Sequence, residues 1–151
     1  MRLRFRRSRR TLNFKAVGIP WIFGDGPPIL RNKMKTEDAF LKRLRKICLP
    51  LPEVKEIVTW GHPTFRAGKK DFAVYEEYKG RPCLAFQAGL AGQQALLGDP
   101  RFYRTPYTGH RGWMSLYVDQ PLDWNEIREL VVRSYRLVAL KRMLKALDQT
   151  P

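Results

Sequence analysis

The segment from Arg101 to Val118 constrains the fold of this chain most, because its residue pattern dictates both a strand and a turn. Met114, Leu116 and Val118 recur with the period of two that gives a strand one buried face. The residues that alternate with them then point to the opposite face: Trp113, Ser115 and Tyr117. The sequence therefore predicts a strand with one apolar side and one side rich in aromatic residues.

The stretch before this strand combines turn formers with cations and aromatic rings. Pro106, Gly109 and Gly112 divide the segment into the two strands of a hairpin and a loop. The loop and its flanks carry five side chains suited to binding: Arg104, Tyr107, His110, Arg111 and Trp113. Such a mixture suits contact with phosphates and stacking on bases or sugars. The alternative is a solvated hairpin tip whose aromatic residues complete the edge of the core.

The net charge of the chain indicates which kinds of molecule it is suited to bind. The 151 residues include 29 lysines and arginines against 14 aspartates and glutamates, which gives a formal charge of +15. Such a field favours polyanions, which include nucleic acid, anionic membrane and acidic protein. The length and a hydrophobic content of 44% indicate one folded domain with its own core and argue against a disordered chain.

The sequence lacks the signatures of a membrane protein or a metalloprotein. No apolar stretch approaches the roughly 18 residues that a membrane helix needs. Cys48 and Cys83 lie in apolar patterns of different predicted elements and lack metal-ligand spacing. They are typical of small buried residues in a reducing compartment. We therefore expect a soluble cytoplasmic protein with no membrane partner and no bound metal.

Residues 1–33 differ in composition from the rest of the chain. They hold nine basic residues and one acidic residue, so roughly half of the excess charge lies there. Glycines and prolines before Ile29 disfavour a regular helix or a central strand. Three interpretations remain open: a nucleic-acid-binding arm, a targeting segment, or an upstream extension with natural translation starting at Met34. We favour the last, and expect residues 1–33 to form a basic, poorly ordered extension and residues 34–151 a single domain.

From Thr36 onward, hydrophobic periodicity predicts three helices and an antiparallel sheet. The expected order is a helix capped by Thr36, a meander of three strands, a short helix, the hairpin and a long last helix. Asp123 is expected to cap that last helix, and the Glu126 side chain is expected to accept a bond from the Asp123 backbone amide in a capping box. This order predicts a two-layer α+β sandwich with the two longer helices packed on one face of the sheet.

The other face of that sheet should present aromatic side chains. By strand alternation these are Tyr75, Tyr103, Trp113 and Tyr117. Exposed aromatic residues at this density indicate a binding surface or a dimer contact. The alternative is that a loop or the N-terminal residues cover them.

Four local motifs, in this order, resemble the MmcQ/YjbR family of small bacterial proteins. They are LPEV at 51–54, GHPTFRAGKKDFA at 61–73, FYRTPYTGHRGW at 102–113 and SYRLVALKRM at 134–143. The resemblance spans about residues 36–148. It implies an α-β3-α-β2-α fold and a DNA-binding role, described as a double-wing arrangement.

The resemblance also implies that individual positions of this chain correspond to positions of interest in the family. They are Gly61, Pro63, Phe65, Arg66, Lys69, Thr105, Pro106, Gly112, Trp113, Lys141 and Arg142. Many members have a more basic or His-containing loop before the tryptophan. Here Gly109 and Gly112 open the loop while His110 and Arg111 retain two polar groups, so we expect a looser contact than in those relatives.

The leading hypothesis is non-catalytic DNA binding with little sequence specificity. Phosphate contacts give affinity without sequence selection, and we assign them to Arg66, Lys69, Arg104, Arg111, Lys141 and Arg142. Stacking is assigned to Tyr107 and Trp113, with His110 in the same loop. The alternative is a protein-interaction or small-ligand module that uses the aromatic face of the sheet and could form a homodimer through it.

An enzyme is the third and least favoured class. His62 and His110 are the only histidines, and neither lies at ligand spacing to another histidine or a cysteine. Neither cysteine has a local motif for a nucleophile, and the sequence contains no Gly-rich phosphate loop. We therefore expect no catalytic activity and no cofactor.

Overall fold

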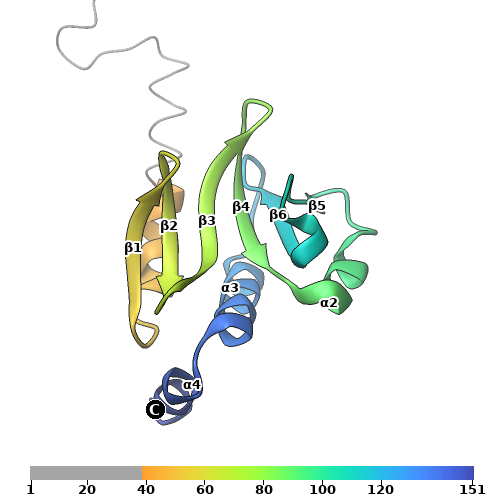
Figure 1. Cartoon of the computed structure of the whole chain (residues 1–151). Helices are drawn as coiled ribbons and strands as arrows, with labels where there is room; N and C mark the ends of the chain where they lie inside the picture. The colour runs from red at the N-terminus through yellow and green to blue at the C-terminus, as the bar shows by residue number, and fades with distance from the viewer. Residues whose placement is uncertain (1–38) are drawn as a thin grey trace, which may run out of the picture. The chain divides into compact units, whose positions relative to one another are not determined.

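The structure of the protein is a computed structural model that describes residues 39–151. The predicted basic extension, the start at Met34 and the cap at Thr36 lie outside the described residues. Within the described part, six strands form one antiparallel sheet in the order β1-β2-β3-β4-β6-β5, and helices complete the fold (Figure 1). The predicted α+β class with an antiparallel sheet is confirmed.

Four strands form a continuous meander. They are β1 (Val54–Thr59), β2 (His62–Ala67), β3 (Lys70–Tyr78) and β4 (Arg81–Gln87). The β1–β2 and β3–β4 connections are two-residue turns, Trp60-Gly61 and Lys79-Gly80, with positive φ at both positions. Positive φ at both residues defines the type I′ turn, whose twist matches that of the paired strands. The sequence predicts only three strands here, because it leaves β1 as an unassigned β segment.

The second half of the chain alternates helices with a hairpin. Its elements are α2 (Gly89–Leu96), β5 (Phe102–Arg104), the short 3-10 helix η1 (Gly109–Arg111), β6 (Trp113–Tyr117), α3 (Trp124–Val138) and α4 (Lys141–Asp148). Strand β6 pairs with both β4 and β5, so the predicted hairpin is confirmed and extends the sheet, with β5 at its edge. The loop that carries η1 therefore lies at one end of the sheet, beside the end of β4.

The core lies between the sheet and two helical segments. The helical residues 39–48, orange in Figure 1, lie behind β1 and β2, and α3 packs against β3 and β4. Phe40 stacks on Tyr75 of β3 at 5.1 Å and packs at a tilt against Trp124 of α3 at 5.2 Å, measured between ring centroids. Both helical segments thus cover the same face, which we call the helix face; we call the other the open face.

A β-bulge in β3 shifts the alternation of its side chains. Phe65 pairs with Ala73 and Arg66 with Asp71, so Phe72 has no partner in the ladder. The extra residue turns into the core, where its ring meets Tyr135 edge-on at 5.5 Å. Successive residues Phe72 and Ala73 are both buried as a result.

Hydrogen bonds from α3 fix the helix to the strands beneath it. The Ser134 hydroxyl accepts a bond from the Gln87 amide at 2.8 Å and donates one to the Phe72 carbonyl oxygen. The Tyr135 hydroxyl donates to the Pro52 carbonyl oxygen at 2.9 Å. Since these side chains are buried, each bond satisfies a polar group that water cannot reach.

Three further expectations need correction. Tyr75 lies on the helix face, because its ring is stacked on Phe40 and is 9% exposed. The long last helix is two helices, because Ala139 and Leu140 adopt extended backbone between α3 and α4. Asp123 does cap α3, because its carboxylate accepts from the Asn125 backbone amide at 2.8 Å. Glu126, however, does not complete the capping box; it forms an ion pair with Arg101 at 2.8 and 2.9 Å.

Candidate functional site

Two adjoining cavities lie beside the β5–β6 loop: one on the open face, reaching the β1–β2 turn, and one at the edge of the sheet, where Leu137 and Val138 of α3 also line it. We call the first the aromatic cavity; it measures about 360 Å³ and is bounded by Trp60, Tyr107 and Trp113. We call the second the basic groove; it measures about 740 Å³ and its lining includes Lys70 and Arg111. Asp71, Thr108 and Trp113 line both, so the two cavities adjoin, and we call them together the depression.

Trp60 stands at the tip of the β1–β2 hairpin. It occupies the first position of the type I′ turn with φ +53° and is 94% exposed. A left-handed conformation costs a non-glycine residue about 1 kcal/mol or more, and asparagine is the usual choice at this position. The turn thus holds a large apolar ring in water at a strained position, and no packing within the described residues explains it.

Tyr107 is the counterpart of Trp60 in the β5–β6 loop. It is 95% exposed and has φ +65°, so it too combines a left-handed backbone with an uncovered ring. The two rings come from turns that are 47 residues apart in the chain, yet both line the aromatic cavity. Strained residues of this kind cluster at binding sites, where the surrounding structure enforces them.

The β5–β6 loop is held in place by side chains from α2 and the sheet. The buried Gln93 amide donates to the carbonyl oxygens of Gly109, at 2.6 Å, and Trp113, at 3.0 Å. The Thr105 and Ser115 hydroxyls are 2.8 Å apart and hydrogen-bonded. A Cβ atom on Gly112, whose φ is +93°, would collide with Gln87 and with the backbone of Gly89. These hydrogen bonds and the close approach at Gly112 hold the loop in one conformation.

The floor of the aromatic cavity is part apolar and part polar. Val74 and Ala85 supply apolar surface, and Thr64, His62 and Glu76 supply polar groups. Burial raises the pKa of the Glu76 carboxyl, and the neighbouring His62 opposes that shift. No hydrogen bond or ion pair of the Glu76 carboxylate is found within residues 39–151. A half-buried carboxyl with a perturbed pKa in a cavity is a candidate for contact with a ligand.

The basic groove contains cations that are not neutralised by the described residues. Lys70 and Arg111 form no ion pair among residues 39–151. The one carboxylate in the lining, Asp71, accepts a bond from Arg66 at 2.6 Å, so its charge is already compensated. The groove therefore offers net positive charge next to the ring of Trp113.

The structure brings four of the predicted site residues to the depression. Arg111 and Trp113 line the basic groove, Tyr107 lines the aromatic cavity, and Arg66 is bonded to Asp71 at the junction. Arg104 and His110 face a separate cavity of about 400 Å³ beside α2. They are thus on the same loop but outside the depression.

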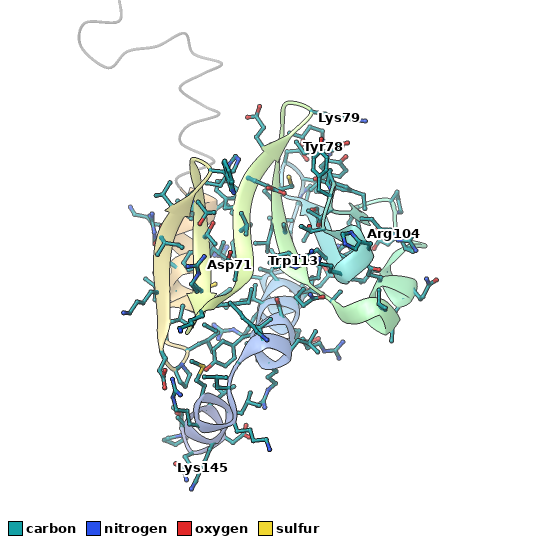
Figure 2. The ribbon with its side chains drawn as sticks, viewed as in Figure 1. Asp71, Tyr78, Lys79, Arg104, Trp113 and Lys145 are labelled. Atoms are coloured by element: carbon teal, nitrogen blue, oxygen red, sulfur yellow. The ribbon has the colours of Figure 1, made fainter. Side chains whose placement is uncertain are left out.

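The three remaining predicted residues lie on the β2–β3 turn and on α4. A Cβ atom on Gly68 would meet Met143 at 2.8 Å, which shows that α4 packs on this turn beside Lys69. Arg142 is committed to a two-bond ion pair with Glu53 at 2.8 Å, whereas Lys141 is exposed. Lys79 of the β3–β4 turn and Lys145 of α4 lie at opposite ends of the view in Figure 2.

Sequence reasoning missed three residues of the depression. Trp60 carried a signal, because a Trp-Gly pair between two alternating strands is an unusual hairpin turn. Glu76 resembles any carboxylate on a strand until its burial is known. Lys70 is adjacent to the predicted Lys69, and the sequence cannot tell which of two neighbouring lysines faces the groove.

A second aromatic group on the open face is engaged internally. The Tyr103 ring stacks on Tyr78 at 5.2 Å and on Tyr117 at 4.7 Å, and its hydroxyl donates to the Cys83 sulfur at 3.1 Å. The Arg81 guanidinium lies 3.7 Å from the Tyr117 ring centroid. Burial raises the pKa of the Cys83 thiol to about 11, so the thiol is protonated at neutral pH. These rings stabilise one another.

Two further features bear on the class of site. Within residues 39–151, no three histidine, cysteine, aspartate or glutamate side chains gather in a way that could hold a metal ion. None of the helices in this part of the chain has the length and apolar character needed to cross a bilayer.

Comparison with known proteins identifies the fold's relatives. No curated protein matches the chain. A Deinococcus radiodurans protein with a DUF419 domain superimposes with a TM-score of 0.59 at 19% identity, covering 73% of this chain and 88% of that one. A Pseudomonas syringae protein superimposes with a TM-score of 0.55 at 16% identity, covering 66% and 96%. The YjbR family model matches residues 49–137, which is more than half of the chain, and this protein therefore belongs to the YjbR family.

Proposed function

We propose that the protein is a non-catalytic nucleic-acid-binding protein, with DNA as the first candidate, that contacts phosphates through the basic groove. The observation that carries this proposal is the juxtaposition of unneutralised cations with an aromatic ring in one depression. Lys70, Arg111 and Trp113 all line the groove, and its only carboxylate is paired with Arg66. Such a surface attracts a polyanion whatever its sequence.

The charge of the described part supports the same partner. Residues 39–151 contain 19 lysines and arginines against 11 aspartates and glutamates. Seven of those carboxylates are already bound to arginines, including Arg142. The excess positive charge therefore resides on cations that are left to attract a partner. Of the predicted contacts, Lys69, Arg104, Arg111 and Lys141 belong to this group, and Arg66 and Arg142 do not.

A second candidate function is the binding of a small ligand or a protein segment in the aromatic cavity. The cavity volume of about 360 Å³ and the exposed rings of Trp60 and Tyr107 favour this alternative. It differs from nucleic-acid binding in its salt dependence, because apolar contacts release no counterions. A homodimer through this face would show itself as a mass that depends on concentration in sedimentation experiments.

The test is a fluorescence anisotropy titration of labelled duplex DNA with the full chain and with a Lys70→Ala, Arg111→Ala double variant. We expect the double variant to bind at least about tenfold more weakly at moderate salt, since each lost phosphate contact removes counterion release. The matched control is Lys42→Ala, Lys46→Ala, which removes two exposed charges from helical residues 39–48 on the helix face. Equal weakening by both variants would mean that overall charge, and not the groove, governs binding.

A further inference from the structure

We propose that the aromatic cavity captures one unstacked base of a single-stranded nucleic acid, while Lys70 and Arg111 in the adjoining groove hold the flanking phosphates. This inference rests on the proposed function and deepens it, because it names the form of nucleic acid and the part of it that each cavity takes. The two sites share the lining residues Asp71, Thr108 and Trp113, so a base and its flanking phosphates could occupy them side by side.

Two exposed rings border the aromatic cavity, and nothing in the described chain uses them. Trp60 and Tyr107 are 94% and 95% exposed, and both have positive φ. Because turn residues such as asparagine or glycine would relieve that strain, the rings lower stability where they stand. Aromatic side chains that project beside a basic groove are the platform on which proteins stack successive bases.

The aromatic cavity has the volume that a base requires. A cavity of about 150 Å³ holds a benzene molecule, and the aromatic cavity measures about 360 Å³, which is ample for a nucleobase. Its walls are rings and its floor includes Val74 and Ala85, so a flat, largely apolar face would be covered. A base that is stacked and paired in a duplex cannot enter, which favours a single strand over a duplex.

The floor of the cavity also carries a polar group that could select among bases. The Thr64 and Thr105 hydroxyls are already bonded, to the His62 carbonyl oxygen at 3.1 Å and to Ser115 at 2.8 Å. Glu76 is left as an acceptor without a bond in the described chain. A carboxylate accepts from the amino groups of cytosine and adenine, whereas thymine has no amino group and flanks its single ring N–H with two carbonyl oxygens. We therefore expect strands rich in cytosine and adenine to bind more tightly than oligothymidine.

The experiment compares three labelled probes with the full chain by anisotropy. The probes are a 12-nucleotide strand of alternating cytosine and adenine, a 12-nucleotide oligothymidine and a 12-base-pair duplex. The variants are Trp60→Asn and Tyr107→Asn, because asparagine tolerates the left-handed backbone and keeps each turn intact. The control is Val58→Ala, which truncates a residue that is 74% exposed and lines neither cavity.

The outcomes separate this inference from the function on which it rests. Support is a preference of the wild type for the cytosine-adenine strand over the duplex, a loss of at least about fivefold in single-strand affinity in each asparagine variant, and unchanged binding by the control. Base capture would be overturned by equal affinity for strand and duplex, or by asparagine variants that bind like the wild type. Neither result would contradict phosphate binding in the groove. A wild type that binds none of the probes would overturn both.

Discussion

The two faces of the sheet are built from the same strands but differ in how completely their side chains are buried. On the helix face, Phe65, Leu84, Phe86 and Met114 are at most 1% exposed and belong to one continuous core. On the open face, side chains of the same strands line a cavity, and the turn and loop beside it hold two rings, Trp60 and Tyr107, that remain in water. One face is fully packed against helices, and cavities remain on the other.

This difference separates the residues that stabilise the fold from those proposed to bind. Burial of apolar surface favours the folded state, so substitutions on the helix face should act on stability. The strained turn residue Trp60 and the half-buried Glu76 lower stability where they stand, as is expected of residues retained for binding. Substitutions on the open face should therefore change binding, and some should stabilise the fold.

The largest expected effect is the loss of a ring from the helix face. Phe86→Ala removes a side chain that is 1% exposed and packs edge-on against Phe102 at 6.3 Å. We expect the free energy of unfolding to fall by about 3 to 5 kcal/mol, measured by urea denaturation. The matched change on the open face, Tyr107→Ala, removes a ring that is 95% exposed and should alter it by less than about 0.5 kcal/mol. Similar losses in both variants would abolish the distinction between the faces.

A smaller effect of opposite sign is expected at the β1–β2 turn. Trp60→Asn replaces a strained, exposed ring by the residue that type I′ turns prefer. We expect the free energy of unfolding to rise by about 1 kcal/mol in the same denaturation experiment. If the variant is instead less stable than the wild type, the ring makes a stabilising contact and is not available to a base.

The smallest expected effect is a pH dependence at Glu76. Burial raises the pKa of this carboxyl above its ordinary value of 4.5. As the pH rises past that value, the unfolded chain releases the proton first, and stability falls until the folded carboxyl has also ionised. We therefore expect Glu76→Gln to raise the melting temperature at pH 7, and the difference from the wild type to vanish near pH 4. A difference that is constant across this range would mean that ionisation of Glu76 carries no penalty.

The architecture follows from the sequence to a large extent, because period-two alternation and glycine or proline turns are local signals. They predict the strand that buries Met114, Leu116 and Val118, the hairpin around it, and helices against one face. Tyr75 is misplaced because the bulge at Phe72 changes the alternation within β3, and a bulge depends on pairing with β2. The break between α3 and α4 is likewise invisible, since Ala139 and Leu140 favour a helix locally.

The candidate site follows from the sequence only in part. The β5–β6 loop is predictable because Arg111 and Trp113 lie together in a short segment with glycines. The opposite wall of the depression comes from Trp60, whose signal in the sequence is limited to the unusual Trp-Gly pair between two alternating strands. Only the pairing of the strands into one sheet brings that turn to the same cavity as Tyr107, and no single stretch of sequence contains that pairing.

The central claim is that phosphates bind in the groove lined by Lys70 and Arg111, and the salt dependence of binding tests it most directly. The measurement is the slope of the logarithm of the binding constant against the logarithm of salt concentration, for the full chain and the Lys70→Ala, Arg111→Ala variant on duplex DNA. Each phosphate contact contributes about 0.9 to that slope. We predict that the double variant loses about 1.8 of it; an unchanged slope would contradict phosphate binding in the groove.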